Sequence, residues 1–154
     1  MIYQTYGPSS TVGTYLGHAK QLTDAAMSLD RQRSGIAGNM LLGHALEVTL
    51  KAWLLAEGLK RGEPLDKVKR TLAKAPFGHD LQNLWDAAVR EGLAIPTSRP
   101  IWFEYLAAMH GAPFRVRYPP NAVAFPVPED TVCNHVLSLI EIIANASGLT
   151  YTGN

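Results

Sequence analysis

The sequence predicts an all-α protein: an up-and-down bundle of four main helices, one or two minor helices and a long proline-rich loop. Two observations lead to this fold class. Residues 34–57 carry apolar or small side chains around almost the whole helical circumference, as in a helix enclosed by others. Further segments repeat apolar residues at helical spacing between short polar, glycine or proline connections. We expect a single domain over residues 10–148, with flexible tails at 1–9 and 149–154.

In the first half of the chain, residues 10–29 predict a helix capped by Ser10 or Thr11, because small polar side chains satisfy free amides at helix starts. Ser34 can cap the central helix in the same way. Gly58 stands where a C-cap glycine is common, so we expect that helix to end at Glu57. A short third helix is expected between residues 60 and 74.

In the second half, Asp80 is the expected N-cap of a fourth helix, which Gly92 closes. Pro100 suits the first turn of a fifth helix that runs to about His110. Its expected packing face comprises Ile101, Tyr105, Ala108 and Met109. Residues 129–146 predict the last helix, with one polar strip formed by Asn134, Ser138, Glu141 and Asn145.

Composition narrows the function classes. The formal net charge of +1 argues against duplex DNA binding, which usually needs a far more basic surface. The lone Cys133 permits no internal disulfide and is expected in the core. We see no signal-peptide pattern and no long apolar run, and therefore predict a cytoplasmic protein without a membrane partner.

A narrow polar strip interrupts the apolar central helix. His44, Glu47 and Lys51 are spaced three and four residues apart, so they share one face of the helix. Glu47 and Lys51 can form a helical ion pair, and the same residues could instead serve a ligand or partner. Farther along the chain, His79 is interpreted as a turn residue before the Asp80 cap.

The proline-rich stretch 111–128 cannot be helical. Within it Arg115 and Arg117 alternate with apolar residues, so an extended segment would send both guanidiniums to one side. Arginine matches phosphate oxygens and tyrosine can stack on a base. Arg115, Arg117 and Tyr118 are therefore candidates for a phosphate-bearing ligand, against the alternative of a solvated loop.

Three pieces of sequence, in this order, resemble a known superfamily. They are GHALEVTLKAWLLAEG (43–58), GHDLQNLWDAAVREGL (78–93) and the tripeptide Arg117-Tyr118-Pro119 before the closing helix. Over residues 34–146 the chain resembles the HEPN superfamily (higher eukaryotes and prokaryotes nucleotide-binding domains). The resemblance implies a small helical bundle, often dimeric, and a place in toxin–antitoxin or defence systems, frequently beside a nucleotidyltransferase. Some members are metal-independent ribonucleases.

The chain departs from the ribonuclease members at their motif, an Arg followed by four to six residues and a His. None of the five histidines has an Arg at that distance before it. The nearest pairing in the late part of the chain joins Arg117 to His135, with seventeen residues between them. We therefore expect a non-catalytic module that binds a nucleotide, RNA or protein partner. The alternatives are a metal-independent ribonuclease using His135 with Arg115 or Arg117, and a purely structural dimerisation domain.

Two further expectations concern partners and cofactors. Trp102, Phe103 and Tyr105 cover too wide an arc for one core face, which favours a homodimer through the fifth and last helices. The resemblance points the same way and adds a nucleotidyltransferase-type protein as a possible partner. The sequence contains no glycine-rich phosphate loop and no paired Cys/His ligand spacing, so we predict no metal and no cofactor.

Overall fold

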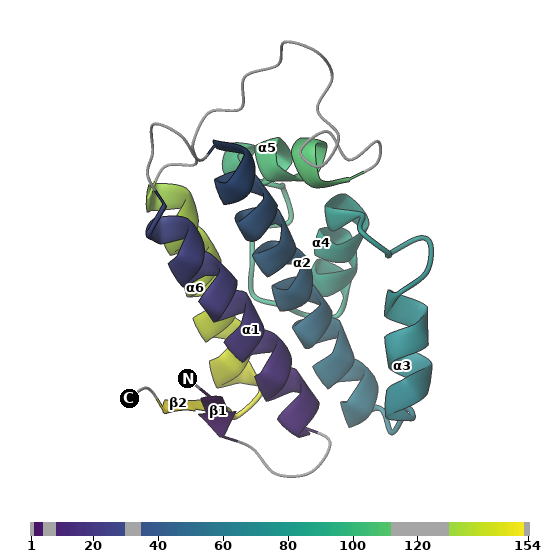
Figure 1. Ribbon diagram of the computed structural model, residues 1–154. Coiled ribbons are helices and arrows are strands. Elements are labelled where there is room, and N and C mark those ends of the chain that lie inside the picture. The colour runs from purple at the N-terminus through teal and green to yellow at the C-terminus, as the bar shows by residue number, and fades with distance from the viewer. Residues whose placement is uncertain (1, 5–8, 30–34, 112–129, 153–154) are drawn as a thin grey trace.

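The computed structural model describes residues 2–4, 9–29, 35–111 and 130–152 (Figure 1). These residues form six helices and two three-residue strands. The helices are α1 (Ser9–Met27), α2 (Gly35–Lys60), α3 (Leu65–Leu72), α4 (Leu81–Arg90), α5 (Ile101–His110) and α6 (Asp130–Ala146), and the strands are β1 (Ile2–Gln4) and β2 (Thr150–Thr152). The predicted all-α bundle is confirmed. Among the described residues, none of the helices combines the length and apolar character needed to cross a bilayer.

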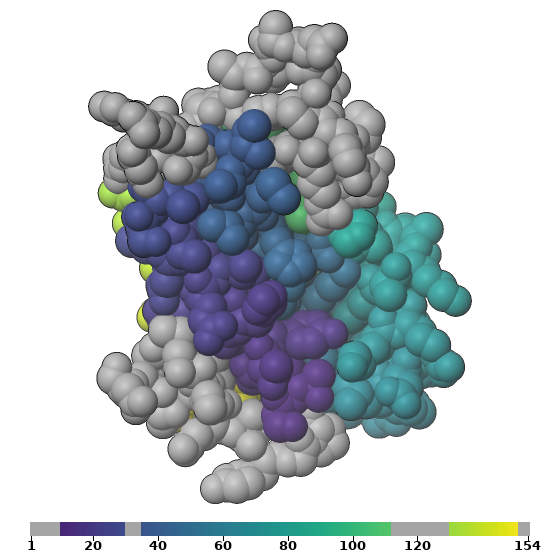
Figure 2. Space-filling view, in the orientation of Figure 1, coloured from purple at the N-terminus to yellow at the C-terminus, as the bar shows by residue number. Residues whose placement is uncertain are grey.

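Helix α2 occupies the centre of the bundle, with α1 and α6 on one side and α3 and α4 on the other (Figure 1). It contacts each of the other five helices. In the space-filling view α2 reaches the surface as a strip between α1 and the α3–α4 side (Figure 2). Its buried side chains include Leu42, Leu46, Leu50 and Leu55, all fully enclosed. Burying one leucine side chain stabilises the fold by about 1.5–3 kcal/mol relative to leaving it exposed, so these residues of α2 contribute much of the stability of the core.

The end of α2 differs from the prediction. Gly58 is not a C-cap; it is buried within α2, which continues to Lys60, and Gly62 (φ +78°) provides the positive φ beyond it. A Cβ atom at Gly58 would lie 2.8 Å from Cγ2 of Val68 in α3. The glycine therefore serves helix packing, since its missing side chain lets α3 approach α2.

The buried face of α5 also differs from the prediction. Ile101 and Ala108, expected to pack, are exposed, and Ile101 shows 90% of its surface. The residues that face the core are Phe103, Leu106, Ala107 and His110. They too follow helical spacing, but the face includes a histidine, which a hydrophobicity pattern counts as polar.

Short strands lie in both segments that were predicted to be tails. β1 pairs antiparallel with β2, and Tyr3 is opposite Tyr151. Residues 2–4 and 150–152 therefore have regular structure, and the two ends of the described chain lie side by side (Figure 1).

Candidate functional site

A buried carboxylate with three basic partners stands out in the described part of the chain. Glu47 keeps only 4% of its side chain exposed. Its Oε1 accepts a hydrogen bond from Nζ of Lys51 at 2.7 Å. Its Oε2 lies 2.6 Å from Nε2 of His110 and 3.0 Å from Nδ1 of His79. We call these four residues the Glu47 cluster.

Three separate elements supply the Glu47 cluster. Glu47 and Lys51 lie one turn apart on α2 and form the predicted ion pair, in which Glu47 is buried and Lys51 is partly buried. His110 is the last residue of α5. A Cβ atom at Gly43 would lie 2.6 Å from Nδ1 of His110, so this glycine leaves the room that the ring occupies against α2.

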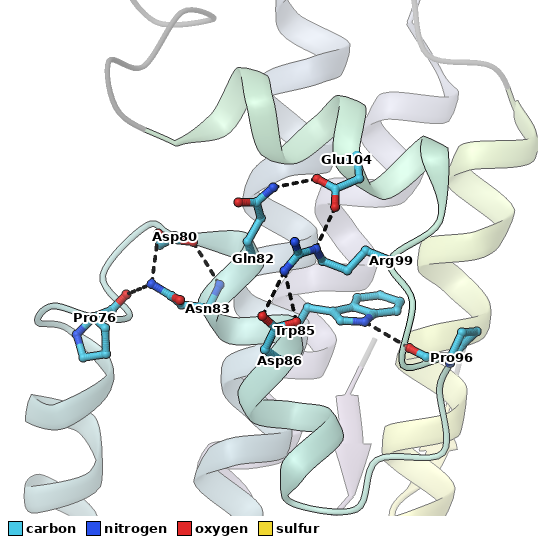
Figure 3. Close-up of polar contacts among 9 residues, drawn as sticks. All are labelled: Pro76, Asp80, Gln82, Asn83, Trp85, Asp86, Pro96, Arg99 and Glu104. Atoms are coloured by element: carbon cyan, nitrogen blue, oxygen red, sulfur yellow. Dashed lines mark hydrogen bonds and ion pairs between the residues drawn. The ribbon is translucent and has the colours of Figure 1, made fainter.

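His79 is positioned by the turn before α4. Asp80 is the predicted N-cap, and its Oδ1 accepts a hydrogen bond from the backbone amide of Asn83 at 2.9 Å. The Asn83 side chain donates in turn to the carbonyl of Pro76 at 2.9 Å (Figure 3). These bonds tie the turn to the start of α4 and thereby fix the backbone beside His79.

A second network holds α4 and α5 at a fixed distance. Nη1 of Arg99 donates to Asp86 in α4 at 2.9 Å, and its Nε donates to Glu104 in α5 at 2.6 Å (Figure 3). Gln82 also donates to Glu104, at 2.6 Å. Because His79 precedes α4 and His110 ends α5, this network helps to set the separation of the two histidines.

The electrostatics of the cluster favour an ionised carboxylate. Burial by itself would raise the pKa of Glu47, but hydrogen bonds from His110, Lys51 and His79 outweigh burial and hold the pKa far below its usual value. A carboxylate only accepts hydrogen bonds, so the imidazole nitrogens that face it carry protons. Glu47 is therefore an anion, and both of its oxygens accept hydrogen bonds.

The cluster borders a surface cleft of about 490 Å³, a size suited to a small ligand. The side chain of His79 is 47% exposed and connects the buried carboxylate with this cleft. The other residues that line the cleft are Ala75, Pro76, Phe77, Gly78, Asp80, Leu81, Gln82, Ala107, Ala108 and Gly111. The cleft therefore lies between the turn before α4 and the end of α5.

The other predicted site residues are placed elsewhere or lie outside the described ranges. The ring of His44 meets that of His18 in α1 edge-on, with 5.5 Å between ring centroids. His135 stacks on Trp102 at 5.1 Å and lines a separate, apolar groove. Arg115, Arg117 and Tyr118 lie outside the described residues, as does all of the predicted proline-rich loop (111–128) except Gly111.

Sequence reasoning missed His110 as a site residue and saw His79 only as part of a turn. They stand 63 and 32 residues from Glu47, and no linear spacing joins them to it. The helical spacing of His110 with Phe103 and Leu106 was the one available signal. The prediction of no metal rested on linear ligand spacing, yet one ligand atom each from Glu47, His79 and His110 lie within 4.8 Å of one another.

Comparison with known proteins adds no relative: no family model matches the chain, and no curated protein or solved structure gives a significant match.

Proposed function

We propose that this chain is a HEPN-like helical module that binds a nucleotide unit, free or within RNA, in the cleft beside His79. One observation carries the proposal. Of the sequence pieces that resemble the superfamily, 43–58 supplies Glu47 and 78–93 supplies His79, and these two side chains are hydrogen-bonded at 3.0 Å. Two segments that are distant in the chain thus meet at the edge of a ligand-sized cleft.

The lining of the cleft suits a base and its attached groups. Phe77 offers an aromatic side chain, and proteins commonly hold unstacked bases by aromatic stacking. His79 and Gln82 add polar side chains that can form hydrogen bonds. Apolar walls with a few polar groups are the usual composition of a binding pocket.

The state of Glu47 favours binding over catalysis. A general base works best when its pKa lies near the working pH, whereas the pKa of Glu47 is held far below its usual value by its three donors. The ribonuclease motif of the superfamily is also missing from the linear sequence. We therefore assign Glu47 the role of orienting His79 and His110 rather than that of taking up a proton.

Calorimetric titration of the full chain with nucleoside triphosphates and with short single-stranded RNA, both in EDTA, tests this function. We expect saturable binding that weakens about tenfold in His79→Ala, because about 1.4 kcal/mol of ligand contact would be lost. His18→Ala is the matched control, since His18 is an exposed histidine on α1 and should leave the affinity unchanged. Absence of binding to all of these probes would refute the proposal.

An RNA cleavage assay on the same samples distinguishes the ribonuclease alternative from a binding module. RNA incubated with the protein in EDTA should remain intact if the module only binds. Cleavage that disappears in His135→Ala would instead identify the ribonuclease, and would contradict a non-catalytic function.

A further inference from the structure

The three possible metal ligands of the Glu47 cluster come from three elements of the fold. Glu47 lies in the middle of α2, His79 in the turn before α4 and His110 at the end of α5. Glu47 and His110 are buried and His79 is exposed towards the cleft. Two imidazoles and one carboxylate converging on one point are the ligand set of many zinc and other transition-metal sites.

We propose that Glu47, His79 and His110 bind one divalent transition-metal ion of the zinc class. The ion would take Oε2 of Glu47, Nδ1 of His79 and Nε2 of His110, the three atoms that already meet within hydrogen-bonding distance. The proposal does not rest on the HEPN-like function, because metal binding is measurable without any nucleotide.

The protons of the cluster can be accounted for. Nδ1 of His79 and Nε2 of His110 now face a carboxylate and carry protons, but a metal ligand must present a lone pair. In a neutral imidazole the proton moves to the other ring nitrogen, and in a charged imidazole the proton facing the carboxylate is released to solvent. Oε2 of Glu47 then moves slightly away from both histidine nitrogens, since metal–ligand bonds of about 2.0–2.2 Å place neighbouring ligand atoms somewhat farther apart than the present 2.6 Å and 3.0 Å.

Lys51 has a supporting part in this site. Its ammonium holds Oε1 of Glu47 at 2.7 Å, so that Oε2 is the oxygen turned towards both histidines. Hydrogen bonds of this kind orient the carboxylates that bind metals. With neutral imidazoles the charges of Lys51 and Glu47 cancel, so a bound ion would retain its charge and favour an anionic further ligand from the cleft.

Calorimetric titration of the metal-free, tag-free 154-residue chain with Zn²⁺ tests the proposal. We expect one ion per chain, and visible absorption of bound Co²⁺ typical of a nitrogen- and oxygen-ligated site. His79→Ala should weaken Zn²⁺ binding at least about tenfold, because even partners of metal ligands are worth about 10–100-fold. His18→Ala makes the same change at an exposed histidine of α1 and should bind Zn²⁺ as the wild type does.

A second variant tests the position of the ion without removing a ligand. Gly43→Ala places a methyl group 2.6 Å from the present position of Nδ1 of His110 and should displace that ring, weakening Zn²⁺ binding. Circular dichroism shows whether each variant is folded, and the exposed His79→Ala remains decisive if Gly43→Ala is not. Wild type without stoichiometric Zn²⁺ binding, or folded His79→Ala with unchanged affinity, would overturn the proposal.

Discussion

The two ends of α5 border two depressions of similar size and opposite character. At its C-terminal end the cleft of about 490 Å³ adjoins a buried carboxylate with three basic partners. Near its N-terminal end Pro100 and Trp102 line a groove of about 420 Å³, whose other walls are Trp85, Ile95, Pro96, His135, Ser138, Leu139 and Ile142. The cleft lies beside side chains that are held by hydrogen bonds to one carboxylate, whereas the groove is lined mainly by apolar side chains.

Two histidines show what this difference means. His110 is 5% exposed, and its Nε2 is fixed 2.6 Å from a carboxylate oxygen. His135 is exposed to solvent and its ring lies flat on Trp102, with an interplanar angle of 6°. A charged hydrogen bond sets direction and proton position, while stacking sets only the plane of the ring. The environment, and not the residue type, therefore decides which histidine can take part in specific chemistry.

The largest expected effect comes from removing the buried charge. Glu47→Gln should lower the free energy of unfolding by about 3–5 kcal/mol, because the Lys51 ammonium, 14% exposed, loses its carboxylate partner. Glu57→Gln is the matched control on the same helix, since Glu57 pairs with the exposed Lys60 and should cost below about 1 kcal/mol. Urea unfolding followed by circular dichroism measures both. Equal losses in the two variants would contradict a special role for the buried cluster.

A smaller effect is expected at the turn that carries His79. Asp80→Ala removes the side-chain cap of α4 and should cost about 1 kcal/mol. Asp66→Ala is the control, because Asp66 lies in the first turn of α3, whose N-cap makes no side-chain hydrogen bond. Thermal unfolding compares the two. If Asp80→Ala unfolds at the same temperature as the wild type, the cap does not hold this turn.

A substitution beside the apolar groove is expected to have the smallest effect on stability. It should change the oligomeric state instead. The homodimer stays a prediction from the sequence. Ile101 is 90% exposed and stands in sequence between Pro100 and Trp102 of the groove lining, so we expect it to enter the groove of a second copy about a twofold axis. Ile101→Glu should change the free energy of unfolding by less than about 0.5 kcal/mol. Light scattering should give about twice 16.8 kDa for the wild type and the monomer mass for the variant.

Met27→Glu is the control for that experiment, because Met27 is also an exposed apolar side chain but does not line the groove. A monomeric wild type would contradict the homodimer. A dimer that persists in Ile101→Glu would contradict this groove as the interface.

Most of the fold could be predicted because its signals are local. The Asp80 cap, Pro100 before α5, and the positive φ angles of Gly92 and Gly148 all act within a few residues of the helix ends they mark. The Glu47–Lys51 pair was predictable for the same reason, since four residues on a helix bring two side chains together.

The rest of the site could not be predicted because it depends on how helices cross. Glu47 meets His79 and His110 only after α4 and α5 have packed against α2, and no spacing along the chain encodes that contact. The prediction for Gly58 was wrong for a related reason. Its missing side chain leaves room for Val68 of α3, and no special backbone conformation requires a glycine there. Arg115, Arg117 and Tyr118 stay predictions from the sequence.

The central place of α2 also has a consequence for how the bundle opens. α2 contacts all five other described helices. Moving any one of these helices away from the bundle therefore exposes part of the surface of α2. Its amide hydrogens should therefore exchange with solvent only when the bundle unfolds as one cooperative unit. The short α3 contacts α2 along one side, so it can open by itself at lower free energy. A ligand or ion joined to Glu47, His79 and His110 would bind α2, α4 and α5 into one slowly exchanging body and leave α3 outside it.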